Sequence, residues 1–202
     1  MRLYVSALAN NSAMKEVLRD DVVGDVTICC TRRSRRISLS VKPSGEVRLS
    51  FPPYASRTKA LEFLASRREW ILATKEKFTQ RVAEGKSAAQ ITPKEIEQLR
   101  TAAKATLPQR VAELAARHNL KYGKISIRAS RSKWGSCSAV GNISLSLFLM
   151  ILPEHLRDYV ILHELAHTVH HNHSPRFHAL VNSLTNGQEK TLARELKEYS
   201  TR

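Results

Sequence analysis

Three short stretches near the N-terminus alternate apolar and polar residues or are rich in β-branched residues. They cover residues 26–30, 36–42 and 46–51, and Pro43-Ser44-Gly45 separates the last two. Such alternation is typical of half-buried strands, and a Pro-Ser-Gly sequence is typical of a turn. We therefore expect a small antiparallel sheet in this part of the chain.

Helical periodicity follows these stretches. Residues 56–81 carry apolar side chains near helical spacing, which predicts one helix. Trp70 lies on the apolar face of this helix and is expected to be buried in the hydrophobic core. A second helix is expected to begin with Pro93 at its first position, where proline is favoured, and to run to about residue 118. Pro108 lies inside this second segment and is expected to disturb the helix.

Two further strands are expected at residues 124–130 and 142–150, joined by a segment whose glycines permit sharp turns. Within that segment, Trp134-Gly135-Ser136-Cys137 is interpreted as a tight structural turn, with Trp134 in the core and Cys137 as a buried thiol. A third helix is expected to start at Pro153.

The chain has 202 residues, of which 42% are hydrophobic, enough for a sizeable core. We expect an N-terminal extension of unknown structure at 1–24, a basic sheet with a helix at 25–90, and a metal-binding core with C-terminal helices at 91–202. The longest apolar run, 147–152, is far shorter than the roughly 20 residues of a membrane span.

The N-terminal apolar stretch is too short for a secretory signal, and three cysteines are a poor basis for a disulfide framework. A cytoplasmic location is therefore expected.

The formal net charge is +15, and residues 25–151 carry the positive excess. Such a charge attracts polyanions. Four arginines, Arg32, Arg33, Arg35 and Arg36, stand together, either as the solvated tip of a hairpin or as a phosphate-binding patch.

His163-Glu164-Leu165-Ala166-His167 is an H-E-x-x-H motif in an apolar helical context. Positions i and i+4 of a helix share one face, so the imidazoles of His163 and His167 can hold one zinc ion. Glu164 then stands beside the ion as the general base. A catalytic zinc usually has three protein ligands, so a third is expected, with one ion per chain.

Three later histidines are candidates for the third ligand. On a continued helix, His170 would lie too far along the axis. Asn172 tolerates the left-handed conformation and is expected to end the helix, and Ser174-Pro175 is expected to cap and start another. His173 therefore lies at a bend where the chain can turn back. We favour His173, with His170 and His178 as alternatives. Its spacing from the motif equals that of H-E-x-x-H-x-x-G-x-x-H zinc peptidases.

The motif lies in one of four segments that carry a resemblance to a known family. These segments are residues 134–138, 141–145, 159–167 and 172–177. Together they resemble the YgjP-like metallopeptidase-domain family, which is related to SprT-like and WLM zinc proteases. The resemblance extends more weakly over about residues 25–185. It implies an α+β fold in which a small N-terminal antiparallel sheet and helices precede a zincin-like core, with a short sheet packed on the H-E-x-x-H helix.

The resemblance also implies site residues. The family's third ligand is the histidine of an Asn-His-Ser triplet, which matches His173. Family members usually carry tryptophan where this chain has His178, so the wall of the pocket differs here. Residues 144–148 are expected to be an edge strand that pairs with an extended peptide.

Our first hypothesis is a zinc-dependent peptidase acting on a peptide or protein, in which Glu164 accepts a proton from water and passes it to the leaving amine. Arg176 or His178 would stabilise the oxyanion.

The alternative is a metal-dependent nucleoside triphosphate pyrophosphatase. Its phosphate clamp would consist of seven basic residues: Arg32, Arg33, Arg35, Arg36, Arg128, Arg131 and Lys133. A third hypothesis is a nucleic-acid-binding module with a structural metal, and nucleic-acid binding could also accompany peptidase activity.

Overall fold

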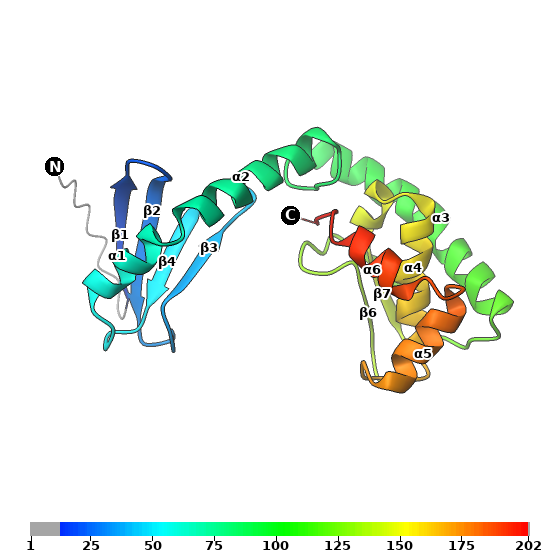
Figure 1. Ribbon diagram of the computed structural model, residues 1–202. Coiled ribbons are helices and arrows are strands. Elements are labelled where there is room, and N and C mark those ends of the chain that lie inside the picture. Colours follow the sequence, from blue (N-terminus) through cyan, green and yellow to red (C-terminus); the bar gives the residue numbers. More distant parts are fainter. Residues whose placement is uncertain (1–12, 202) are drawn as a thin grey trace. The chain divides into compact units, whose positions relative to one another are not determined.

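The computed structural model describes residues 13–201 and has an α+β fold (Figure 1). The chain divides into two compact units after Gln80, and we call residues 13–80 the N-terminal unit and residues 81–201 the C-terminal unit. Residues 81–90, grouped from sequence with the N-terminal part, belong to the C-terminal unit, where Ala88 is fully buried in the core.

The N-terminal unit holds a four-stranded sheet of order β1-β2-β4-β3. Its strands are β1 (Ala13–Asp20), β2 (Gly24–Thr31), β3 (Ser38–Val41) and β4 (Val47–Phe51). β1–β2 and β3–β4 are antiparallel, as expected, but β2 and β4 are parallel. β1 falls in the segment for which the sequence predicted no structure. Among its residues 15–20, only Asp20 is buried, so the strand shows little hydrophobic pattern.

The loop 32–37 joins β2 to β3, and β4 lies between these two strands in the sheet. The interpretation of the four arginines as a hairpin tip was therefore wrong, because the loop crosses the end of β4 instead of reversing the chain into a neighbouring strand. All four arginine residues are exposed.

Two helices replace the single helix expected over 56–81. They are α1 (Arg57–Ala65), capped by Ser56, and α2 (Arg68–Ala83), and the chain breaks between them at Ser66 and Arg67. The break restarts the helical phase, so Ile71 is fully buried while Trp70 is 45% exposed. The placement of Trp70 in the core was therefore wrong.

The C-terminal unit begins with the long helix α3 (Pro93–Arg117). Thr92 caps it through a capping box with Glu95, and Pro93 occupies the first turn as the sequence predicted. The helix continues through Pro108, which does not interrupt it. Leu107, Val111 and other apolar residues of α3 enter the core of this unit.

A three-stranded sheet of order β5-β7-β6 follows, formed by β5 (Ile125–Arg128), β6 (Gly135–Cys137) and β7 (Ile143–Ser146). β5 and β7 are parallel, and β6 and β7 are antiparallel. The strand expected to reach residue 150 ends at Ser146, whose hydroxyl accepts a hydrogen bond from the Phe148 amide and caps the 3₁₀ helix η1 (Leu147–Ile151).

Two expectations about this sheet were wrong. The segment expected to be a tight turn contains the strand β6, with Trp134 half-buried beside the core. Residues 144–148 are not an edge strand, because β7 lies between β5 and β6. The edge strand next to the histidine motif is instead β6.

Three helices complete the unit: α4 (Glu154–Ala166), α5 (Pro175–Leu184) and α6 (Glu189–Leu196). α4 packs against α3, β6, β7, α5 and α6, so it forms the centre of the unit, and most of its length is buried. No helix within residues 13–201 is long and apolar enough to cross a membrane.

Candidate metal centre

Three imidazoles converge where α4 ends. His163 lies in the last turn of α4, His167 is its C-cap residue, and His173 lies in the loop that precedes α5. One ligand nitrogen from each residue lies within 4.8 Å of the others, and Nε2 of His163 is 3.1 Å from Nε2 of His173. Across residues 13–201, no other group of histidine, cysteine or acidic side chains converges in this way.

The chain turns back because α4 ends early. The helix stops at Ala166, and the following turn is closed by the His170 amide, which donates to the Ala166 carbonyl at 2.9 Å. The expectation that Asn172 ends the helix in a left-handed conformation was wrong, because Asn172 has no positive φ. Ser174 caps α5, as predicted, through its hydroxyl and the Phe177 amide.

A backbone carbonyl orients one of the rings. Nδ1 of His167 lies 3.1 Å from the carbonyl oxygen of His170, so Nδ1 carries the proton and Nε2 keeps its lone pair. His170 thus contributes its main chain to the cluster, while its imidazole stays outside the group. An outer hydrogen bond of this kind is what metal-binding histidines usually make.

His178 and Arg176 lie on α5, outside the group of three. Nδ1 of His178 is 2.6 Å from Oε1 of Glu189 at the start of α6, so this imidazole joins two helices. The Arg176 residue is exposed in the first turn of α5. Of the three candidate ligands, His173 therefore lies beside the motif histidines, whereas the imidazoles of His170 and His178 lie outside the group.

Phe177 forms the apolar floor of the cluster. Its ring is fully buried and stacks on His167 with centroids 4.4 Å apart, and it meets His163 and His173 edge-on at 4.9 and 4.8 Å. Aromatic packing of this kind restricts the ring orientations of all three imidazoles. Sequence reasoning assigned no role to Phe177, although the residue stands within the segment that carried the resemblance.

Burial favours the neutral form of the two motif imidazoles. It lowers the pKa of His163 to about 4, and the neighbouring His167 and His173 act in the same direction. The pKa of His167 is lowered as well, first by burial. Neutral imidazole is the form that binds metals, so these residues present lone pairs at physiological pH.

Glu164 points from α4 toward β6 and is only 6% exposed. Its Oε2 atom is buried and has no hydrogen-bond partner within the described residues. Burial raises the pKa of this carboxyl to about 7, while the positive charge of Lys133 acts in the opposite direction. A buried carboxylate without a partner is costly for folding, which marks Glu164 as a candidate functional group.

Gly135 in β6 provides the space for this carboxylate. A Cβ atom at position 135 would lie 2.6 Å from Cγ and 2.7 Å from Oε1 of Glu164. Any other residue would displace the Glu164 side chain. From the sequence, Gly135 was expected only to permit a sharp turn. Its contact with Glu164 could not be predicted, because it depends on how β6 packs against α4. The pKa of the nearby Cys137 thiol is raised by burial and by Glu164, so this thiol is a poor nucleophile.

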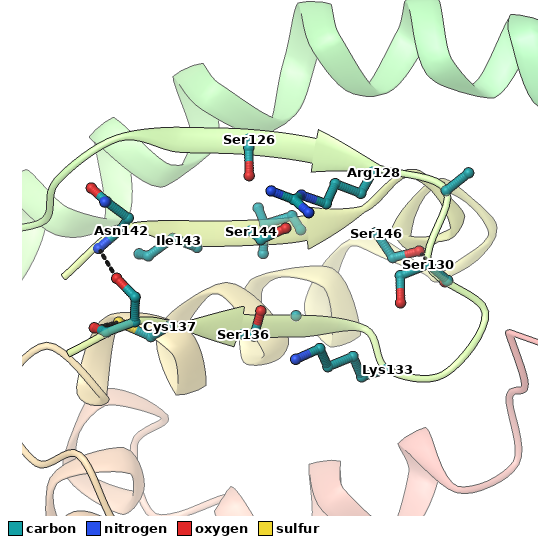
Figure 2. A pocket seen from close by; sticks show the side chains of 14 residues that line it. Ser126, Arg128, Ser130, Lys133, Ser136, Cys137, Asn142, Ile143, Ser144 and Ser146 are labelled. Atoms are coloured by element: carbon teal, nitrogen blue, oxygen red, sulfur yellow. Dashed lines mark hydrogen bonds between the residues drawn. The ribbon is translucent and has the colours of Figure 1, made fainter. Parts of the chain in front are cut away.

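The seven basic residues of the expected phosphate clamp have different environments. Arg131 donates to the Ala88 carbonyl at 2.6 Å and covers the Phe148 ring, so it takes part in packing. Arg128 and Lys133 line a groove on the β5-β7-β6 sheet (Figure 2). The four arginines of the 32–37 loop are exposed residues of the N-terminal unit.

Comparison with known protein families defines the class of the C-terminal unit, which is a metallopeptidase domain. Residues 81–199 match the family described as YgjP-like, metallopeptidase domain. The match covers more than half of the chain, and the chain therefore belongs to the YgjP-like metallopeptidase-domain family, as the resemblance indicated.

Among solved structures, the chain is similar to the crystal structure of the metallopeptidase zymogen of Pyrococcus abyssi abylysin. The two share 20% sequence identity with a TM-score of 0.38, over 47% of this chain and 99% of the other. No curated protein matches the sequence.

Proposed function

We propose that this protein is a zinc-dependent peptidase in which His163, His167 and His173 hold one zinc ion and Glu164 is the general base. One observation carries the proposal. The buried Oε2 atom of Glu164 has no partner within the described residues, and Glu164 adjoins His163, whose ligand nitrogen lies within 4.8 Å of those of His167 and His173.

The donor set fits zinc. Catalytic zinc sites commonly use three protein ligands, three histidines among them, and keep a fourth position for water or substrate. The lowered pKa of His163 and the hydrogen bond from His167 to a backbone carbonyl both favour imidazoles with available lone pairs. When bound, zinc supplies Lewis acidity, which polarises a carbonyl group and makes water nucleophilic near neutral pH.

Glu164 would move the proton. Its raised pKa, about 7, lets the side chain act both as a base and as an acid at physiological pH. The carboxylate accepts a proton from the attacking water, and the resulting acid donates that proton to the nitrogen of the leaving group. Gly135 keeps the space that this carboxylate occupies.

The substrate would bind along β6. This strand is an edge of its sheet and contains Gly135, the residue that faces Glu164. An extended peptide can add to a sheet edge through main-chain hydrogen bonds, which would lay a scissile bond beside the carboxylate. For the oxyanion we favour Arg176, which has no ion pair within the described residues, over His178, which is paired with Glu189.

The test is a metal-replete activity panel of peptides, DNA-bound protein and nucleoside triphosphates. We expect peptide hydrolysis, and a loss of at least about 10²-fold in Glu164→Gln, because an amide cannot accept the water's proton. Glu154→Gln, an exposed residue of the same helix, is the matched control and keeps its activity. Triphosphate hydrolysis that depends on Glu164, without cleavage of any peptide or protein, would contradict the proposal.

A further inference from the structure

The outer face of the β5-β7-β6 sheet carries a groove of about 760 Å³. Serine hydroxyls cross its floor, because Ser126 of β5 and Ser136 of β6 both stand opposite Ser144 of β7 in the strand register (Figure 2). Residues that pair across neighbouring strands project to the same face of a sheet. The buried residues Ile143 and Leu145 alternate with Ser144 and face the core.

Two cationic side chains stand beside these hydroxyls. Arg128 ends β5, and Lys133 precedes β6 and runs alongside it in Figure 2. The side chains of Arg128, Lys133 and the three serines make no hydrogen bond or ion pair within residues 13–201, and no acidic residue lines the groove. This polar lining has donors available and a net positive charge, which suits a ligand that carries carboxylate or another oxyanion.

The groove adjoins the candidate active site across a single strand. Gly135 lines the groove, and a Cβ atom at this position would touch Glu164. Successive side chains of a strand point to opposite faces, so Ser136 faces the groove while its neighbours face α4. A peptide that extends the sheet at β6 would therefore present every second side chain on the groove side.

We infer that this groove binds acidic side chains of the peptide substrate, with Lys133 and Arg128 as the residues that determine this specificity. The inference rests on the proposed peptidase function. Aspartate or glutamate on the groove side of the bound peptide receives hydrogen bonds from the serine hydroxyls and from the two cations. Basic side chains at the same positions meet like charge and are rejected.

The experiment uses the zinc-loaded full chain and three peptides that differ only at alternate positions, which carry alanine, aspartate or lysine. The unsubstituted protein is expected to cleave the aspartate peptide with a kcat/KM about fivefold above the alanine peptide, the size of one exposed ion pair. Lys133→Glu and Arg128→Glu reverse the preference between aspartate and lysine peptides. Lys190→Glu, an exposed position of α6 outside the groove, leaves it unchanged.

A binding measurement distinguishes failure of the specificity inference from failure of the proposed peptidase function. Labelled peptides are titrated into the zinc-loaded Glu164→Gln protein, and inorganic phosphate serves as competitor. Cleavage of all three peptides at equal rates overturns the inference and leaves the peptidase function intact. A protein that neither binds nor cleaves any peptide overturns the peptidase function itself. Phosphate binding that requires Lys133, together with equal affinity for the three peptides, overturns the assignment of an acidic peptide.

Discussion

A buried carboxylate lies beside the sheet in each unit, Asp20 in the first and Glu164 in the second, and these two carboxylates have opposite environments. Asp20 of the N-terminal unit is 8% exposed and accepts hydrogen bonds from Arg68 at 2.7 Å and from the amides of Val22 and Val23 at 3.0 and 3.1 Å. Glu164 of the C-terminal unit is 6% exposed, and its Oε2 has no partner within the described residues.

Their pKa values shift in opposite directions. Burial opposes ionisation of Asp20, but the hydrogen bonds from Arg68, Val23 and Val22 outweigh it, so the pKa is below its usual value. Burial raises the pKa of Glu164 to about 7. A carboxylate that stabilises a fold has its hydrogen bonds satisfied, whereas one that is available for proton transfer does not. We therefore expect Asp20 to stabilise the N-terminal unit, and Glu164 remains the proposed general base of the C-terminal unit.

The largest effect is expected for Gly135→Ala. The added methyl group enters the space of the Glu164 side chain, so we expect peptide hydrolysis to fall by about 10² or more while zinc stays bound. The substitution should also destabilise the C-terminal unit by about 1–3 kcal/mol, as overpacking does. Urea unfolding followed by Trp134 fluorescence in a Trp70→Phe background measures the stability.

A double-mutant cycle shows whether Gly135 acts through Glu164. In a Glu164→Ala background the atoms that meet the new methyl group are absent, so Gly135→Ala should cost little stability there. An equal loss of stability in both backgrounds would mean that Gly135 serves the backbone of β6 alone, and that it does not position the carboxylate.

Sequence patterns that rest on local rules predicted much of this site. The spacing of the H-E-x-x-H motif and the Ser174-Pro175 cap are local signals, and the structure places His163 and His167 at the end of a helix and starts α5 after Ser174. The roles of Gly135 and Phe177 could not be predicted, because they depend on which strand and which helix pack against α4. For the same reason, the parallel pairing of β2 with β4 left no signature in the sequence.

A smaller effect is expected for Asp20→Asn, which replaces the charged acceptor of four hydrogen bonds with a neutral group. The N-terminal unit should lose about 1–3 kcal/mol, with no change in zinc content or peptide hydrolysis. Because the pKa of Asp20 is lowered on folding, its contribution is complete above about pH 4, the unfolded value, and is lost as the pH falls through the folded value.

Urea unfolding between pH 3 and pH 7, followed by Trp70 fluorescence in a Trp134→Phe background, checks this dependence. The difference in stability between the parent and Asp20→Asn should shrink below about pH 4. A difference that is constant over this range would show that ionisation of Asp20 does not stabilise the unit.

The smallest effect is expected for replacing Arg32, Arg33, Arg35 and Arg36 with serine. These exposed residues belong to the N-terminal unit, so hydrolysis of a short neutral peptide should stay nearly unchanged. Non-specific binding of polyanions should weaken and become less sensitive to salt, because phosphate contacts release counterions. A steep rise in KM for the neutral peptide would assign the loop a part in catalysis.

Zinc stoichiometry tests the central claim most directly, namely that the C-terminal unit holds a catalytic metal on three histidines. Metal analysis of the purified full chain after equilibration with zinc should give close to one ion per chain. His163→Ala, His167→Ala and His173→Ala should each abolish this stoichiometric binding, while His170→Ala retains it. Full occupancy in His173→Ala, with loss in His170→Ala or His178→Ala, would contradict the account.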